Sequence, residues 1–94
     1  MNVLILGSGG REHALAKAVS KSSILTKLVV IPGNPGIKDY AKCINIDPLN
    51  NGLIKEFCAK EDIDLVIPGS EVFLENGITD ALNDTKTLVF GPTK

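Results

Sequence analysis

The stretch that decides the fold is Val3-Leu4-Ile5-Leu6-Gly7-Ser8-Gly9-Gly10-Arg11-Glu12-His13-Ala14. Its first four residues form a short continuous apolar run, which is typical of a β-strand buried on both faces. A glycine cluster follows directly, and helical spacing then continues from Gly10 to about Ser20. A strand that turns through small residues into a helix exposes the first backbone amides of that helix, and these amides favour an anion such as phosphate.

The rest of the sequence alternates between predicted strands and predicted helices. Further apolar runs predict strands at 28–31, at a short edge segment within 39–47, at 64–67 and at 87–90. Helical spacing predicts helices at about 50–60 and 75–83, and the inward face of the first would carry Leu53, Ile54, Phe57 and Cys58. This alternation predicts an α/β fold with a mostly parallel sheet of four to five strands.

Composition narrows the class of protein. The 94 residues suit a single domain, and ten basic and eleven acidic residues are mixed along the chain for a net charge of −1. With no basic block, we expect neither a nucleic acid nor a membrane as partner. Cys43 and Cys58 do not form a CxxC pair, so we expect reduced, mostly buried thiols of an intracellular protein. The apolar run Val3–Leu6 is far too short for a signal peptide or a membrane span, so the expected compartment is the cytoplasm.

Three glycine-bearing loops follow the predicted strands: Gly7–Gly10, Pro32–Gly36 and Gly69–Glu71. In a parallel sheet the carboxyl ends of the strands lie at one edge, and ligands bind there at the topological switch point. We therefore expect the three loops to converge on one ligand site.

The first loop admits three interpretations. Gly7 and Gly9 match the start of a dinucleotide fingerprint, but Glu12 stands where the third glycine belongs, and the second strand ends without an acidic residue. A tight turn that binds nothing remains open, because glycine suits such turns for backbone reasons alone. Arg11 favours a ligand, since a cation beside the positive end of a helix is better explained by a bound anion.

The candidate binding residues are Gly7, Ser8, Gly9, Gly10, Arg11, Asn34 and Glu71. Asn34 lies either in a purely rigid turn or at the mouth of the site, and Glu71 either holds a hydroxyl or amine or caps the helix expected near Glu75. Glu12 is expected to accept from amides at the helix start, and His13 to be solvated or to contact a ligand. The sequence contains no nucleophile elbow, no Walker lysine pattern and no carboxylate cluster, so we expect no catalytic or metal-binding residue.

Four motifs together resemble one family, phosphoribosylamine–glycine ligase, also called glycinamide ribonucleotide synthetase. They are GSGGREHA at 7–14, PGNPG at 32–36, DLV-x-x-GxE at 64–71 and FGPTK at 90–94. The resemblance covers essentially the whole chain. The third loop departs from the family pattern GPE-x-PL, because Ser70 and Phe73 replace both prolines, and the loop should be less rigid.

The resemblance implies a Rossmann-like, three-layer domain that precedes an ATP-grasp domain. The complete enzyme joins glycine to 5-phosphoribosylamine in purine synthesis, using ATP with Mg²⁺ or Mn²⁺. Its N-terminal domain lines the phosphoribosyl side of the cleft, so the expected partners are phosphoribosylamine or its glycinamide product and the remaining domains of the polypeptide. The ATP-grasp and C-terminal domains are absent from residues 1–94, and this piece alone should bind no cofactor and be inactive. A stand-alone nucleotide or sugar-phosphate binding module, and a docking domain whose loops bind nothing, remain as alternatives.

Overall fold

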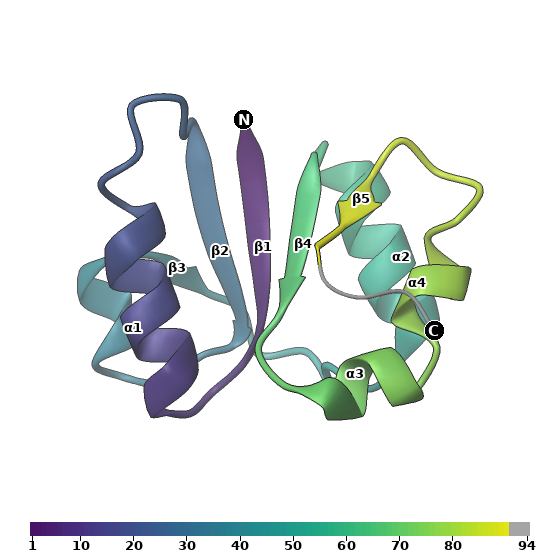
Figure 1. Ribbon diagram of the computed structural model, residues 1–94, viewed down its shortest axis with the longest axis horizontal. Helices are drawn as coiled ribbons and strands as arrows, with labels where there is room; N and C mark the ends of the chain where they lie inside the picture. Colours follow the sequence, from purple (N-terminus) through teal and green to yellow (C-terminus); the bar gives the residue numbers. More distant parts are fainter. Residues whose placement is uncertain (91–94) are drawn as a thin grey trace.

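The computed structural model describes residues 1–90, in which a five-stranded sheet carries helices on both sides (Figure 1). The strands are β1 (Asn2–Gly7), β2 (Lys27–Pro32), β3 (Lys42–Cys43), β4 (Leu65–Pro68) and β5 (Leu88–Val89). The helices are α1 (Gly10–Val19), α2 (Asn51–Lys60), α3 (Glu71–Glu75) and α4 (Ile78–Ala81), with a short 3₁₀ helix, η1 (Ile37–Asp39). The FGPTK motif lies outside the described residues from Gly91 onward.

The strands are all parallel and lie in the order β3-β2-β1-β4-β5. The chain extends the sheet from β1 through β2 to β3, and then returns through α2 to add β4 and β5 on the other side of β1. This reversal places the topological switch point between β1 and β4. The predicted α/β architecture with a parallel sheet is confirmed.

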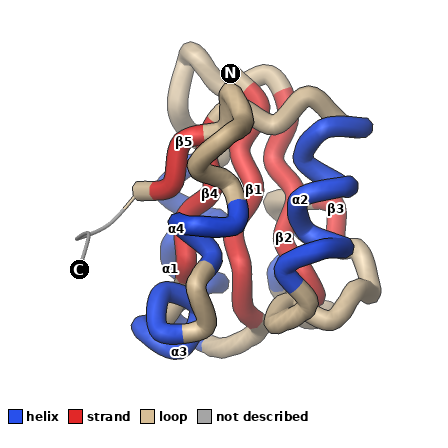
Figure 2. The backbone as a smooth tube through the Cα atoms, turned by 90° about the vertical axis from the view of Figure 1, so that its right-hand side faces the viewer, coloured by secondary structure: helices blue, strands red, loops and turns tan. Residues whose placement is uncertain are grey.

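Both faces of the sheet are buried. Leu4 and Leu6 of β1 belong to the core under α2, α3 and α4, whereas Val3 and Ile5 belong to the core under α1 and η1. Figure 2 shows α1 and α2 on opposite sides of the sheet. Because successive side chains of a strand point to opposite faces, a strand covered on both faces must be apolar at every position. This requirement explains the continuous apolar run in β1.

Several predicted helix details are wrong. The helix expected at 75–83 is replaced by α3 and α4, which are separated at Gly77, whose φ of 87° is left-handed and cannot continue a helix. In α2, Ile54 and Cys58 are buried and Phe57 is half-buried, but Leu53 is 45% exposed.

The two outermost strands are also shorter than expected, since β3 and β5 pair with a neighbour through two residues each.

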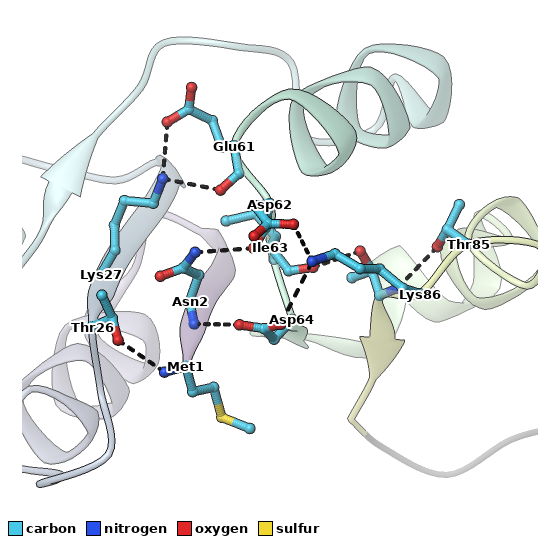
Figure 3. Close-up of polar contacts among 11 residues, drawn as sticks. Met1, Asn2, Thr26, Lys27, Glu61, Asp62, Ile63, Asp64, Thr85 and Lys86 are labelled. Carbon is cyan, nitrogen blue, oxygen red and sulfur yellow. Dashed lines mark hydrogen bonds and ion pairs between the residues drawn. The ribbon is translucent and has the colours of Figure 1, made fainter.

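The opposite edge of the sheet, at the amino ends of the strands, is held by polar contacts (Figure 3). The Asn2 amide donates to Asp64 Oδ2 at 2.7 Å, and the Asn2 side chain donates to the Asp62 carbonyl at 3.0 Å. The Met1 ammonium group donates to Thr26 Oγ1 at 3.0 Å. These bonds join residues 25 to 62 positions apart, so they fix the start of β1 against both of its neighbours.

Two ion pairs extend this network. Lys27 Nζ lies 3.1 Å from Glu61 Oε1, and Lys86 pairs with Asp62. Their hydrogen bonds and charges lower the pKa values of Glu61 and Asp62 below the ordinary 4.5 and 3.8. A carboxyl whose pKa is lowered in the folded state stabilises it above the ordinary pKa. That contribution is lost as the pH falls through the lowered values.

Both cysteines are free thiols among the described residues. Cys58 is 1% exposed, and burial raises its pKa to about 11, so it is neutral at physiological pH. Cys43 is half-buried at the end of β3. Within residues 1–90, none of the helices has the length and apolar character needed to span a bilayer.

Ile54→Ala tests the packing of α2 on the sheet. Ile54 is fully buried, so we expect a loss of about 2–5 kcal/mol in the free energy of unfolding, measured by urea denaturation. Leu53→Ala on the same helix is the matched control and should cost less than about 1 kcal/mol. Equal losses at the two positions would contradict the orientation of α2.

Lys86→Met tests the ion pair at the amino edge. Because Lys86 lowers the pKa of Asp62, we expect that pKa to rise toward 3.8 in the variant, as measured by an NMR titration of the carboxyl group. Lys55→Met is the control: it should raise the pKa of Asp84, which Lys55 lowers, and leave Asp62 unchanged. An unchanged Asp62 pKa in the Lys86 variant would show that the pair is absent in solution.

Candidate functional site

The three loops meet at the carboxyl edge of the sheet, at the bottom of Figure 1. The Gly33 amide donates to the Gly7 carbonyl at 3.1 Å, and the Gly69 amide donates to the Leu6 carbonyl at 2.8 Å. The end of β1 is therefore bonded to the second loop on one side and to the third loop on the other. The predicted convergence of the loops is present.

Asn34 fixes the second loop against the first. Its Nδ2 donates to the Ser8 carbonyl at 2.6 Å, and its Oδ1 accepts from the Ile37 amide at 3.1 Å. The two bonds use the side-chain oxygen and one of the two amide hydrogens. Asn34 thus shapes the loops, and one amide hydrogen remains for a ligand.

Arg11 joins the first loop to the third. Its Nη1 donates to the Gly69 carbonyl, although the distance of 3.4 Å makes this a weak bond. The residue is exposed and forms no ion pair with any residue from 1 to 90. Most of the guanidinium donors are therefore free to bind an anion in two-pronged geometry.

The start of α1 offers further donors. Gly9 is the N-cap and has no side chain to cap the helix, and Ser8, Gly9 and Gly10 are exposed. The first amides of the ten-residue helix accordingly have no partner within the helix and carry its positive end. Together with Arg11 they form a local cluster of anion-binding donors.

Glu12 lies elsewhere than the sequence predicts. It is only 8% exposed, and its carboxylate accepts no hydrogen bond from residues 1–90, so the expected contact with the helix amides is wrong. The side chain packs beneath both the first and third loops. A Cβ on Gly7 would lie 2.6 Å from Glu12 Cδ, and a Cβ on Gly69 would lie 2.5 Å from the same atom. The glycines therefore make room for a carboxylate at the switch point between β1 and β4.

This placement weighs against dinucleotide binding. In a dinucleotide fingerprint the third glycine lets the helix pack closely on the strand beside the pyrophosphate. Here Glu12 occupies that position and fills the space between the two loops with a negatively charged group. A pyrophosphate would meet steric and electrostatic repulsion there.

Glu71 stands apart from the other candidate residues. It is exposed in the first turn of α3 and makes no hydrogen bond or ion pair within the described part of the chain. The helix begins at Glu71 rather than near Glu75, because Phe73 is buried in the core and anchors this turn. Phe73 stands where the resembled family has a proline, and its burial in the core holds this turn in place.

His13 packs against the second loop region instead of lying in solvent. It is half-buried, its ring centroid is 5.6 Å from that of Tyr40, and it lies next to Gly36. An open pocket of about 280 Å³ lies beside the same loop and shares Asn34 with the candidate site. Residues 1–90 gather no group of His, Cys, Asp or Glu side chains suited to a metal ion.

Gly69→Ala tests the packing of the loops around Glu12. The added methyl group would collide with Glu12 and lie 2.6 Å from the Leu6 carbonyl oxygen. We expect a loss of about 1–3 kcal/mol in the free energy of unfolding and amide shifts at Gly7 and Gly9 in NMR spectra. Gly10→Ala, where the methyl group meets nothing within 4 Å, is the control and should be neutral or slightly stabilising. Equal stability of the two variants would contradict the loop geometry.

Sequence comparisons find close relatives along the whole chain. It is 49% identical over 94 residues to phosphoribosylamine–glycine ligase of Mesorhizobium japonicum and 42% identical to that of Caldanaerobacter subterraneus. In both cases the match covers 100% of this chain and 22% of the relative. The chain therefore spans about a fifth of the length of these curated relatives.

Solved structures give the same architecture. Phosphoribosylamine–glycine ligase from Thermotoga maritima matches with a TM-score of 0.63 and 26% identity, over 99% of this chain and 20% of that one. Saccharopine dehydrogenase from Saccharomyces cerevisiae matches with a TM-score of 0.72 over 94% of this chain and 20% of that one, but at 23% identity this likeness concerns the fold alone. The family model described as "Phosphoribosylglycinamide synthetase, N domain" matches residues 1–94. The chain therefore belongs to the phosphoribosylglycinamide synthetase N-domain family.

Proposed function

We propose that this chain is the N-terminal, substrate-side domain of a phosphoribosylamine–glycine ligase of purine synthesis, and that it acts in the cytoplasm. The match of the N-domain family model to residues 1–94 is the main support. The convergence of the three loops at the switch point is the structural support, because it gathers anion-binding donors where ligands of such sheets bind.

The chemistry would be divided between this domain and the rest of the polypeptide. In the complete enzyme, ATP phosphorylates the glycine carboxylate, and the amine of phosphoribosylamine then attacks the acyl phosphate and displaces inorganic phosphate. Residues 1–90 do not fit the metal that accompanies ATP, because they gather no suitable set of ligands. We therefore place ATP and Mg²⁺ or Mn²⁺ in the other domains.

The role of this domain is to bind and orient phosphoribosylamine. The exposed amides of Gly9 and Gly10 and the guanidinium group of Arg11 hold the phosphate. Asn34 keeps the first and second loops in register through Ser8. Glu71, exposed in the first turn of α3, accepts from a ribose hydroxyl.

A stand-alone binding module for a nucleotide is the second candidate. The uncapped start of α1 favours it, whereas the position of Glu12 weighs against dinucleotides. NAD and NADP added to this chain should leave its thermal unfolding midpoint unchanged. A ligand at 100 times its Kd would add about 2.7 kcal/mol to the stability, so a clear rise in the midpoint would favour the module.

The direct test compares this 94-residue chain with the full-length polypeptide that carries it. We expect glycine-dependent ATP turnover in the presence of phosphoribosylamine from the full-length protein and none from the short chain. Turnover by the short chain would contradict the division of labour. Absence of turnover by the full-length protein would contradict the ligase function itself.

Arg11→Ala in the full-length protein tests the phosphate site. Loss of a charged hydrogen bond costs about 1.5–3 kcal/mol, so we expect the KM for phosphoribosylamine to rise about 10- to 100-fold, with little change in kcat. Lys17→Ala is the control, because Lys17 is an exposed cation in the last turn of the same helix. An equal response of the two variants would show that only net charge matters.

A further inference from the structure

We propose that the Glu12 carboxylate is a ligand-binding group that accepts a hydrogen bond from an N–H or O–H donor on the sugar of the bound phosphoribosyl compound. This inference rests on the proposed function. It identifies the protein group that contacts the sugar part of the ligand, which would lie deeper in the site than the phosphate. It is carried by the burial of Glu12, by the absence of a hydrogen-bond donor to its carboxylate among residues 1–90 and by its position between two loops.

Glu12 is largely covered by the two loops and yet has no hydrogen-bond donor among residues 1–90. Glu12 is 92% buried, since only 8% of its surface is exposed, yet no described residue donates to its carboxylate. Partial loss of hydration is costly for a carboxylate unless hydrogen-bond donors replace the lost water, and covered polar groups are therefore usually paired. A carboxylate held in this position, with no donor in the described part of the chain, is suited to a donor that arrives with a ligand.

The oxygens of the Glu12 carboxylate remain accessible. No fully enclosed side-chain oxygen or nitrogen among residues 1–90 lacks a hydrogen-bond partner. The unpaired oxygens of Glu12 therefore retain contact with the surface, even though the residue as a whole is covered. Gly9 is the exposed residue beside the carboxylate: a Cβ built on it would lie 3.9 Å and 4.0 Å from the two Glu12 oxygens, whereas Gly7 and Gly69 next to the same side chain are buried.

Two loops are built around this side chain. Any Cβ on Gly7 or on Gly69 would overlap Glu12, so glycine at both positions is required for the carboxylate to remain there. Gly7 belongs to the end of β1, and Gly69 follows β4, on the two sides of the switch point. A side chain with only a packing role would not need to be an acid.

Charge assigns the orientation of the ligand. The Glu12 carboxylate lies in the first turn of α1 and repels a second anion at its own position. The phosphate is therefore held on the outer side, by Arg11 and the amides of Gly9 and Gly10. An amine or hydroxyl of the same molecule then points inward to Glu12. The site therefore recognises a phosphate and a hydrogen-bond donor on one ligand.

The test uses Glu12→Gln in the full-length ligase, with calorimetric titration of inorganic phosphate and ribose 5-phosphate and with the KM for phosphoribosylamine. The substitution keeps the shape and removes the charge. Hydrogen bonds to charged groups are stronger than those to neutral groups. We therefore expect the affinity for a sugar phosphate to fall about tenfold or more and the affinity for inorganic phosphate to stay unchanged. Loss with ribose 5-phosphate identifies a hydroxyl as the donor, and loss confined to phosphoribosylamine identifies the amine.

Stability provides the second readout. The unfolding midpoint of Glu12→Gln should equal or exceed that of the parent protein, because a partly dehydrated charge that has no donor among residues 1–90 is removed. A lower midpoint together with weaker binding of every probe, phosphate included, would indicate a structural role and overturn the proposal. Unchanged binding of both sugar phosphates would also overturn it.

The outcomes separate this inference from the proposed function. If the parent ligase binds the sugar phosphates, and if Arg11→Ala weakens this binding while Glu12→Gln leaves it unchanged, only the proposed role of Glu12 is contradicted. If the parent ligase binds no sugar phosphate, the proposed function fails and the role of Glu12 fails with it.

Discussion

The structure depends on the pairing of the central strand β1 with a parallel neighbour on each side. β1 aligns with β2 from Asn2 to Gly7 and with β4 from Val3 to Leu6. Parallel pairing brings the carboxyl ends of all three strands to one edge, so the loops that follow these strands lie side by side. The bonds from Gly33 to Gly7 and from Gly69 to Leu6 extend the pairing into the loops. The candidate site is therefore a direct result of the sheet order.

Strand positions could be predicted from sequence because burial on both faces leaves a continuous apolar run, as in Val3–Leu6. The loops could be located because glycine and proline end those runs. Other features depend on contacts that no local pattern encodes. Leu53 and Ile54 are adjacent apolar residues, and only the direction in which α2 lies on the sheet decides that Ile54 is buried and Leu53 exposed. Gly77 divides the last helical region through a backbone conformation that spacing does not reveal.

The position of Glu12 was also predicted wrongly because it depends on contacts that no local pattern encodes. An acid in the first turn of a helix usually faces the free amides or solvent, which is what the sequence predicts. The actual position depends on Gly69, 57 residues later in the chain, which leaves room for the side chain. Asn34 is similar, since its partner Ser8 is 26 positions away. The fold of a dehydrogenase can thus be shared while the central crevice is occupied by a carboxylate.

The polar network of Asn2, Asp62, Asp64 and Lys86 lies at the edge of the sheet opposite to the loops. Strands of four to six residues separate the two edges by roughly 13–20 Å, at about 3.3 Å per residue. Substitutions that far apart combine almost independently. The amino edge of the domain can therefore adapt to temperature or salinity without displacing the loops at the carboxyl edge.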